Sequence, residues 1–230
     1  MASIAEVTDR PGTLLPERIR RTFVVRANEA VIAAAGAGLV TLARREAPHA
    51  EIRFELEAAD DMGALRRGDV DLAIGSYSDA TSDVRTSDLI DEHLVAVVRH
   101  GHPSVARGSR LSLKRFAALD HIDVSRKGRR KSAIDVLLAG SSLRRNLLAV
   151  VPSFAVALAI VARSDATAIV PSRLASVLLE CDAIDAYRAP VELPTVTIAQ
   201  LWHASNTDDP PHVWLRSCVA RAAAAVAKRA

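Results

Sequence analysis

The sequence predicts an α/β fold made of two similar lobes. Half of the 230 residues are hydrophobic but only 3% are aromatic, so Ala, Val, Leu and Ile must form most of the core, which suits helices packed on sheets. Short apolar strands alternate with helix-like segments, a pattern typical of parallel sheets with helical crossovers. This alternation restarts near the middle of the chain, so two lobes of roughly 100 residues each are expected.

The first lobe follows a short N-terminal tail, residues 1–20, whose Pro and Gly are typical of loops. TFVVR, residues 22–26, predicts a strand. Asn28 is placed to cap a helix from about residue 31 to residue 46, because its side chain can accept hydrogen bonds from the free N–H groups of the first turn. EIRFEL, residues 51–56, predicts the next strand and completes a β-α-β unit.

A second helix and a third strand complete this lobe. Asp60 or Asp61 can cap a short helix through Arg67. Gly68 can take the left-handed conformation that closes a helix, and alternate apolar residues of DVDLAIG then share one side of a strand ending at Gly75. The β-α-β-α-β pattern predicts a parallel sheet with helical crossovers.

The chain then passes toward a second lobe. LVAVVR, residues 94–99, predicts a fourth strand, and the turn-rich GHPSVARGSR after it marks the passage. The later elements repeat the order of the first lobe. They are expected to be a helix capped by Ser112, a strand HIDVS at 121–125, a helix over about 132–139, a strand at 146–151, a helix from Phe154 to about 162, a strand at 167–170 and a helix from Ser172 to about 180.

Two extended segments are expected to connect the lobes. If residues 94–99 carry the chain into the second lobe, TVTIAQLWH at residues 195–203 brings it back before a terminal helix. Two crossovers form a hinge over a cleft, where the carboxyl ends of strands and the amino ends of helices can bind an anion. The expected domains are subdomain I, residues 21–98 and 203–230, and subdomain II, residues 99–202.

Composition argues against several classes of protein. The 30 basic and 27 acidic residues nearly balance, whereas a nucleic-acid-binding domain usually concentrates basic charge. The N-terminal segment has no apolar stretch of signal-peptide length, which favours a cytoplasmic location. The longest apolar run, residues 147–162, is shorter than a membrane span and is interrupted by Pro152 and Ser153. No membrane segment is therefore expected.

The sequence contains no motif for catalysis or metal binding. Cys181 and Cys218 lack ligand spacing, which fits a reducing compartment and two small buried side chains. His121, Asp123 and Ser125 alternate along one strand, where Cα atoms about 6–7 Å apart are too distant for the relay of a catalytic triad. No catalytic residue, metal or cofactor is therefore expected.

Two other motifs have ordinary explanations beside functional ones. The glycines of AGAG, residues 35–38, come too long after the strand for a dinucleotide loop, so the close approach of two helices is the favoured interpretation. RKGRRK, residues 126–131, has no interleaved aromatic residues. A solvated loop, a ligand-facing rim of the cleft and a nucleic-acid patch all stay open for this run.

Six segments occur in an order and spacing that are more specific than any of them alone. They are RRTFVVRANEA, REAPHAEIRFE, LRRGDVDLAIG, VVRHGHP, VPSFAVALAIVARSDATAIVP and LWHASNTDDPPHVWLR. Together they resemble the effector-binding domain of LysR-type transcriptional regulators, in particular the branch containing nodulation and aromatic-acid-responsive regulators. The resemblance extends from about Arg20 to Val219.

This resemblance implies two Rossmann-like subdomains in a type 2 periplasmic-binding-protein-like fold, no enzymatic activity, and a small anionic or aromatic effector in the cleft. It also implies a homodimer or tetramer, in which the helix over residues 31–46 of one copy meets the helix over residues 154–162 of another. Ala58 departs from the polar residue common in relatives. The effector-binding positions that the resemblance implies are Ala27, Asn28, Glu29, Ala58, Ser125, Arg126, Pro152, Ser153 and Phe154.

A full regulator of this kind carries a winged helix-turn-helix and a linker helix before this domain, and here only a short tail precedes the first strand. The chain is therefore expected to contact DNA only through such a domain, which it lacks. Three alternatives stay open: a cytoplasmic solute-binding-like protein, a dimerisation module without its own DNA reader, and an enzyme on a two-lobed α/β scaffold.

Overall fold

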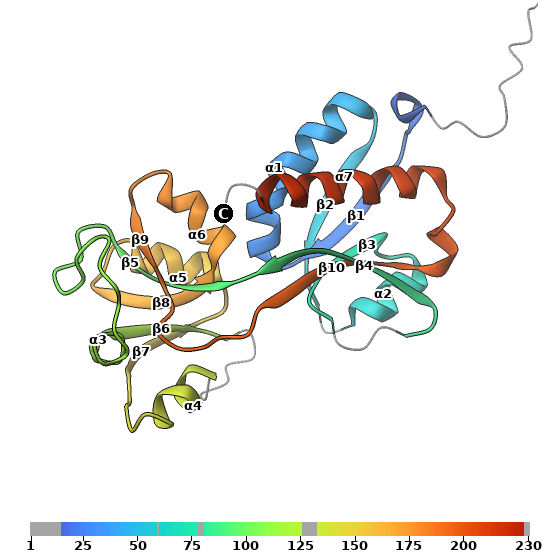
Figure 1. The fold of residues 1–230 in the computed structure, drawn as a ribbon. Helices are drawn as coiled ribbons and strands as arrows, with labels where there is room; N and C mark the ends of the chain where they lie inside the picture. Colours follow the sequence, from blue (N-terminus) through green and yellow to red (C-terminus); the bar gives the residue numbers. More distant parts are fainter. Residues whose placement is uncertain (1–14, 59, 78–80, 126–132, 228–230) are drawn as a thin grey trace, which may run out of the picture.

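The chain folds into two α/β lobes that lie side by side (Figure 1). The computed structural model describes residues 15–58, 60–77, 81–125 and 133–227. Each lobe contains one five-stranded sheet with helices packed against it. The predicted two-lobed α/β fold is therefore confirmed.

The first lobe contains segments from both ends of the chain. Its strands are β1 (Thr22–Ala27), β2 (Glu51–Leu56), β3 (Leu72–Gly75), β4 (Val84–Glu92) and β10 (Val196–His203). Its helices are α1 (Glu29–Glu46), α2 (Asp61–Arg67) and α7 (Pro210–Ala227), with the short 3-10 turns η1 (Pro16–Arg18) and η2 (Ala204–Asn206).

The second lobe is formed by the middle of the chain. Its strands are β5 (Leu94–Arg99), β6 (Asp120–Val124), β7 (Asn146–Val151), β8 (Ala166–Pro171) and β9 (Ile184–Arg188). Its helices are α3 (Leu113–Ala118), α4 (Ala133–Ala139), α5 (Phe154–Val161) and α6 (Ser172–Leu179).

Both sheets are built on the same plan. The strand orders are β2-β1-β3-β10-β4 and β7-β6-β8-β5-β9. In each sheet three strands run parallel, and the fourth and fifth strands in the order continue the sheet through antiparallel pairing. The sheets are therefore mixed, and the antiparallel pairing comes from β10 in the first lobe and β5 in the second.

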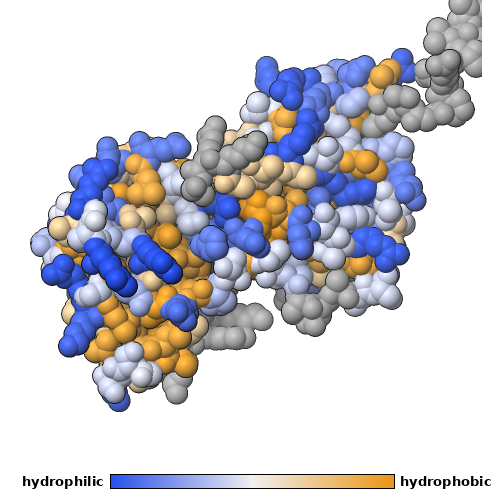
Figure 2. Space-filling view, viewed as in Figure 1, coloured by the Kyte–Doolittle hydropathy of each residue, from blue (hydrophilic) through white to orange (hydrophobic). Residues whose placement is uncertain are grey.

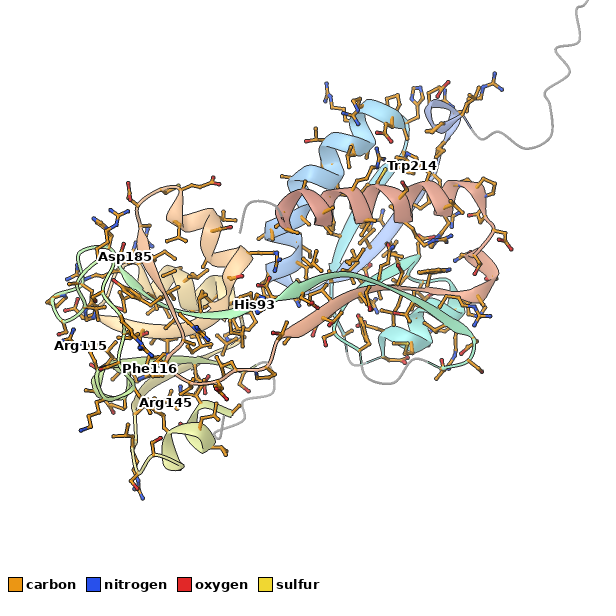
Figure 3. The ribbon with its side chains drawn as sticks, in the orientation of Figure 1. His93, Arg115, Phe116, Arg145, Asp185 and Trp214 are labelled. Atoms are coloured by element: carbon orange, nitrogen blue, oxygen red, sulfur yellow. The ribbon has the colours of Figure 1, made fainter. Side chains whose placement is uncertain are left out.

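The chain passes between the lobes at different points from those expected. His93, between β4 and β5, lies at the first crossing (Figure 3), and residues 189–195 lead back to β10. Residues 94–98 were expected in subdomain I, but β5 pairs with β8 and β9 in the second sheet. Residues 196–202 were expected in subdomain II, but β10 pairs with β3 and β4 in the first sheet. Both boundaries were wrong because the unexpected strand β4 is the last strand of the first lobe before the crossing, and β10 pairs between β3 and β4.

Capping side chains begin several helices where the sequence predicted. Asn28 Oδ1 accepts a hydrogen bond from Val31 N at 2.9 Å, and α1 begins two residues earlier than expected. Asp60 caps α2, and Ser112 caps α3. Gly68 ends α2 in the left-handed conformation, with φ of 74°. These local signals are recognisable because each involves residues only a few positions apart.

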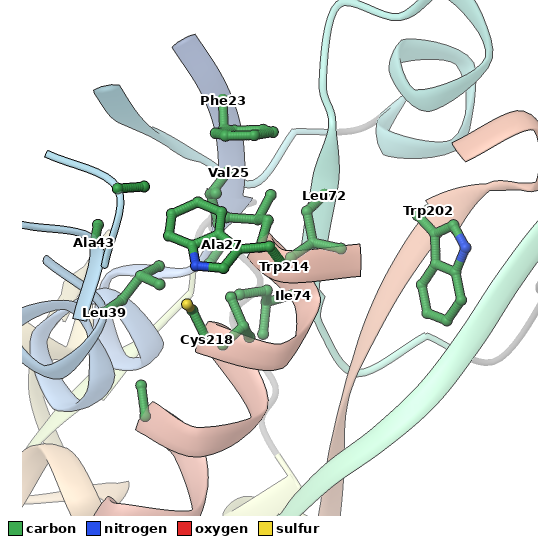
Figure 4. Packing of buried hydrophobic residues seen from close by; sticks show 14 of the residues in the cluster. Phe23, Val25, Ala27, Leu39, Ala43, Leu72, Ile74, Trp202, Trp214 and Cys218 are labelled. Atoms are coloured by element: carbon green, nitrogen blue, oxygen red, sulfur yellow. The ribbon is translucent and has the colours of Figure 1, made fainter. Parts of the chain in front are cut away.

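Buried apolar side chains join the elements of the first lobe. The rings of Phe23 in β1 and Trp214 in α7 lie 5.9 Å apart between centroids (Figure 4). A Cβ atom on Gly38 of α1 would lie 3.4 Å from the Cβ of Ala222 in α7, which confirms that the AGAG segment serves close helix packing. Ala30 of α1 belongs to the core of the second lobe. Helix α1 therefore connects the two cores.

Candidate functional site

The first turns of α1 and α5 meet at the junction of the two lobes. Helix α1 follows the carboxyl end of β1, and α5 follows the carboxyl end of β7. Glu29 Oε1 in α1 accepts a hydrogen bond from Phe154 N in α5 at 2.8 Å. The free N–H groups of a first turn and the positive end of the helix dipole favour an anion at such a place. In this structure the carboxylate of Glu29 is the anion there.

The turn before α5 is held by Ser153. Its Oγ accepts a hydrogen bond from Val156 N at 3.2 Å and so caps the helix. Pro152, which precedes it, is exposed. Ser125 N donates to Val151 O at 2.9 Å, so the ends of β6 and β7 stay paired up to this turn. The structure thus brings Ser125, Pro152, Ser153 and Glu29 to one junction.

Ala58 lies exposed after the carboxyl end of β2. Its N–H donates to Asp61 Oδ1 at 3.0 Å. Asp61 is buried and also accepts from Tyr77 Oη at 3.0 Å and from Arg26 Nη1 at 3.3 Å. Burial, followed by the charge of Asp61, raises the pKa of Tyr77. This polar cluster fixes the loop after β2.

The residues of this cluster were not predicted as a group. Asp61 was expected only as a possible helix cap, and nothing local links Arg26 to Tyr77 in the sequence. One available signal was the charged Arg26, which follows three apolar residues near the end of the strand.

Arg126 and the basic run over residues 126–131 lie outside the described residues. Their predicted place at the rim of the cleft therefore stays a prediction.

A second feature near this junction is an apolar cavity of about 60 Å³. It lies between α1, the first sheet and α7, and the start of α6 borders it. Figure 2 shows hydrophobic surface where the C-terminal half of α7 approaches the second lobe. Of the described residues predicted for the effector site, Ala27 and Asn28 line this cavity and the others do not. Glu92 and Arg173 are its charged lining residues, and both were missed.

The side chains of β6 serve the structure of the second lobe. Arg145 is almost fully buried and binds Asp123 at 2.8 Å and Asp135 at 2.7 Å, which ties β6 to α4 (Figure 3). His121 Nε2 lies 2.8 Å from Phe116 O. His121 and Asp123 therefore have separate partners.

The two cysteines differ from one another. Cys218 is buried in α7, and burial raises the pKa of its thiol to about 11. Cys181 is exposed, so the prediction that both are buried was wrong for this residue. It lies in a turn after the end of α6, where the apolar periodicity of the helix no longer applies.

Across the described ranges, no three His, Cys, Asp or Glu side chains are grouped so that they could hold a metal ion. Over the same part of the chain, no helix has both the length and the apolar composition that crossing a membrane requires.

Two α/β lobes joined by two crossings define the type 2 periplasmic-binding-protein-like fold. The chain matches the family described as LysR substrate binding domain over residues 16–224. It therefore belongs to the LysR family of transcriptional regulators, which are not enzymes.

Two curated relatives show how much of a regulator the chain represents. It is 34% identical over 207 residues to HTH-type transcriptional regulator LinR of Sphingobium indicum, covering 89% of this chain and 67% of LinR. It is 35% identical over 155 residues to HTH-type transcriptional activator NahR of Pseudomonas putida, covering 67% of this chain and 51% of NahR. The chain thus spans about half to two thirds of the length of these relatives.

Solved structures agree on the fold. A probable transcriptional regulator of Pseudomonas aeruginosa, PA0477, superposes with a TM-score of 0.76 at 26% identity, covering 90% of this chain and 68% of that one. The effector-binding domain of BenM with its effector benzoate superposes with a TM-score of 0.67 at 15% identity, covering 88% of this chain and 92% of that one. At that identity the BenM likeness concerns the fold alone.

Proposed function

We propose that the chain senses a small anionic or aromatic molecule, which it binds between the two lobes where α1 and α5 begin. The observation that carries this proposal is the contact between Glu29 and Phe154 N, which brings the first turns of both helices together. The BenM domain, of the same fold, has benzoate as its effector. Ala27, Ala58, Pro152 and Arg126 complete the proposed site.

Hydrogen-bond donors at this junction suit a carboxylate. In the first turn of α5 the N–H of Val156 donates to Ser153 Oγ, and the amide of Asn28 and the hydroxyls of Ser125 and Ser153 lie on the adjoining turns, beside the N–H of Phe154. The carboxylate of Glu29 already accepts one of these N–H groups. An anionic effector that binds at the same place must displace Glu29 or share the donors with it, so Glu29 opposes anion binding.

We infer that the ligand acts by changing the position of one lobe relative to the other. The two crossings, at His93 and over residues 189–195, form the hinge of the proposed sensor. A ligand changes the balance of open and closed states only through its preference for one of them. In the proposed cytoplasmic regulator, the change between open and closed lobes alters the position of a helix-turn-helix domain outside residues 1–230. That domain binds the DNA.

Isothermal titration with matched aromatic and aliphatic carboxylates tests this site. Asn28→Ala and Ser153→Ala should each weaken binding about tenfold, since each removes a hydrogen-bonding side chain beside the ligand. Glu29→Gln should strengthen carboxylate binding severalfold, because Gln keeps an acceptor for Phe154 N without the negative charge.

Ser112→Ala is the matched control, because Ser112 caps α3 away from the junction. It should leave the affinity unchanged. Equal affinity in wild type, Asn28→Ala and Ser153→Ala would show that the ligand does not bind where α1 and α5 begin.

We also propose that two copies pair through α1 of one and α5 of the other. Both helices present exposed apolar side chains, with Val40 of α1 50% and Val156 of α5 42% exposed. Apolar surface on both helices favours such a contact.

A further inference from the structure

Arg173 is a buried cation whose hydrogen bonds are incomplete. Only 7% of the residue is exposed, and it lines the apolar cavity from the start of α6. Its Nη1 donates to Asp91 O at 2.6 Å. Its Nε is buried and has no hydrogen-bond partner among the described residues. A buried donor in this state is costly, so it marks a position where an acceptor would be favourable.

The charge of Arg173 is already balanced. Glu92 Oε1 lies 3.4 Å from Arg173 Nη1. The same carboxylate oxygen also accepts from the N–H and the hydroxyl of Ser172 and from His93 N, which keeps it in place. The free donor therefore belongs to a neutral pair, and a second anion beside Arg173 would be repelled by Glu92. A neutral acceptor oxygen fits this environment better than a carboxylate.

The rest of the cavity wall is apolar and comes from several elements. It includes Val31 and Leu39 of α1, Ile198 of β10 and Val219 of α7. Its volume of about 60 Å³ exceeds the roughly 10–15 Å³ that one water needs and is well below the roughly 150 Å³ of a closed cavity that holds benzene. A guest of a few carbon atoms matches this space.

From these features we infer a second ligand site, which borders the site where α1 and α5 begin at Ala27 and Asn28. It takes a short, neutral, mainly apolar molecule, or the end of one, that carries a single acceptor oxygen such as a ketone. The oxygen accepts from Arg173 Nε, and the carbon chain lies against α1 and α7. Arg173 belongs to the second lobe and most of the wall to the first, so the guest would touch both lobes.

The probes are 2-butanone and butanoate, which have the same number of carbon atoms and differ in charge. Backbone amide shifts are followed by NMR during titration with each probe. The expected result is a saturable shift at Arg173 and along the cavity side of α1 with 2-butanone, and binding of butanoate that is about tenfold weaker or absent.

Ala35 lines the cavity, whereas Ala33 is exposed on the same helix and does not. Ala35→Leu should fill the space and weaken 2-butanone binding about tenfold or more, while Ala33→Leu should bind as wild type does. Arg173→Met should weaken it by a similar factor because the donor is lost. If Arg173→Met fails to fold, the difference in 2-butanone affinity between Ala35→Leu and Ala33→Leu tests whether the ligand binds in the cavity.

Three results would overturn the second site. They are the lack of a saturable shift with 2-butanone, equal binding by Ala35→Leu and wild type, and binding of butanoate in the cavity as tight as that of 2-butanone. Ser153 and Glu29, which the carboxylate titration of the first site also tests, do not line the cavity, so failure of the second site is distinguishable from failure of the first.

Discussion

Glu29 and Phe154 lie 125 positions apart, and their hydrogen bond joins the first turns of two helices from different lobes. The sequence predicted the cap residues Asn28 and Ser153 because a cap acts within its own helix turn. It placed Glu29 in the site only through the family resemblance. The hydrogen-bond partner of Glu29 depends on how the two lobes pack against each other. Local sequence patterns do not predict that packing.

The pH dependence of stability at His121 follows from its burial. The residue is 1% exposed, and burial lowers its pKa from 6.5 to about 4. The unfolded chain takes up this proton near pH 6.5 and the folded chain only near pH 4. The contribution of neutral His121 to stability is therefore complete above about pH 6.5 and is lost as the pH falls toward 4, by up to about 3 kcal/mol.

Urea unfolding between pH 7 and pH 4 measures this effect in wild type and in His121→Gln. The variant keeps a donor for Phe116 O but has no group that titrates, so its free energy of unfolding should fall by about 3 kcal/mol less over this range. Burial also lowers the pKa of His212, and that contribution is common to both proteins. Parallel curves for the two proteins would contradict the assignment.

At the scale of single elements, two glycines of α1 face different neighbours. A Cβ on Gly36 would lie 3.6 Å from Ile32 Cγ2 of the same helix, and one on Gly38 would lie 3.4 Å from the Cβ of Ala222 in α7, so either position accepts a methyl group but a longer side chain at Gly38 would meet α7. Gly36→Ala should therefore raise the free energy of unfolding by about 0.5–1 kcal/mol through helix propensity. Gly38→Leu should lower it by about 1–3 kcal/mol, because the larger side chain pushes α7 away.

Thermal and urea unfolding of these two variants provide the measurement. Both changes improve the intrinsic helix propensity of α1, so propensity alone predicts that both stabilise the protein. Stabilisation by Gly38→Leu would show that α1 and α7 do not pack closely at this point.

The elements missed by the sequence share a property. Strands β4 and β9 carry several polar residues and lack the regular alternation of a strand with one buried face. They form because β10 and β5, which they flank, present hydrogen-bonding edges. Strong local patterns, such as those of β1 and β5, were predicted with nearly the observed bounds.

At the scale of the whole molecule, pairing of α1 with α5 of a second copy predicts specific changes in oligomeric state. Val40→Glu and Val156→Glu place a charge on the proposed contact and should shift a dimer toward monomer, as measured by analytical ultracentrifugation. Val136 of α4 is 69% exposed and lies on neither helix, so Val136→Glu is the control. Dimers of unchanged stability in both test variants would rule out this pairing.

The sequence by itself determined the α/β class, the repeat of the motif in two lobes, and most of the helices and strands. These properties depend on composition, periodicity and caps, which act over a few residues. Only the tertiary structure decided which sheet receives β5 and β10, that Glu29 contacts α5, and that Arg173 lines an apolar cavity beside Glu92. Those outcomes depend on the packing of segments far apart in the chain, since a strand edge or a cavity exists only after its neighbours are in place.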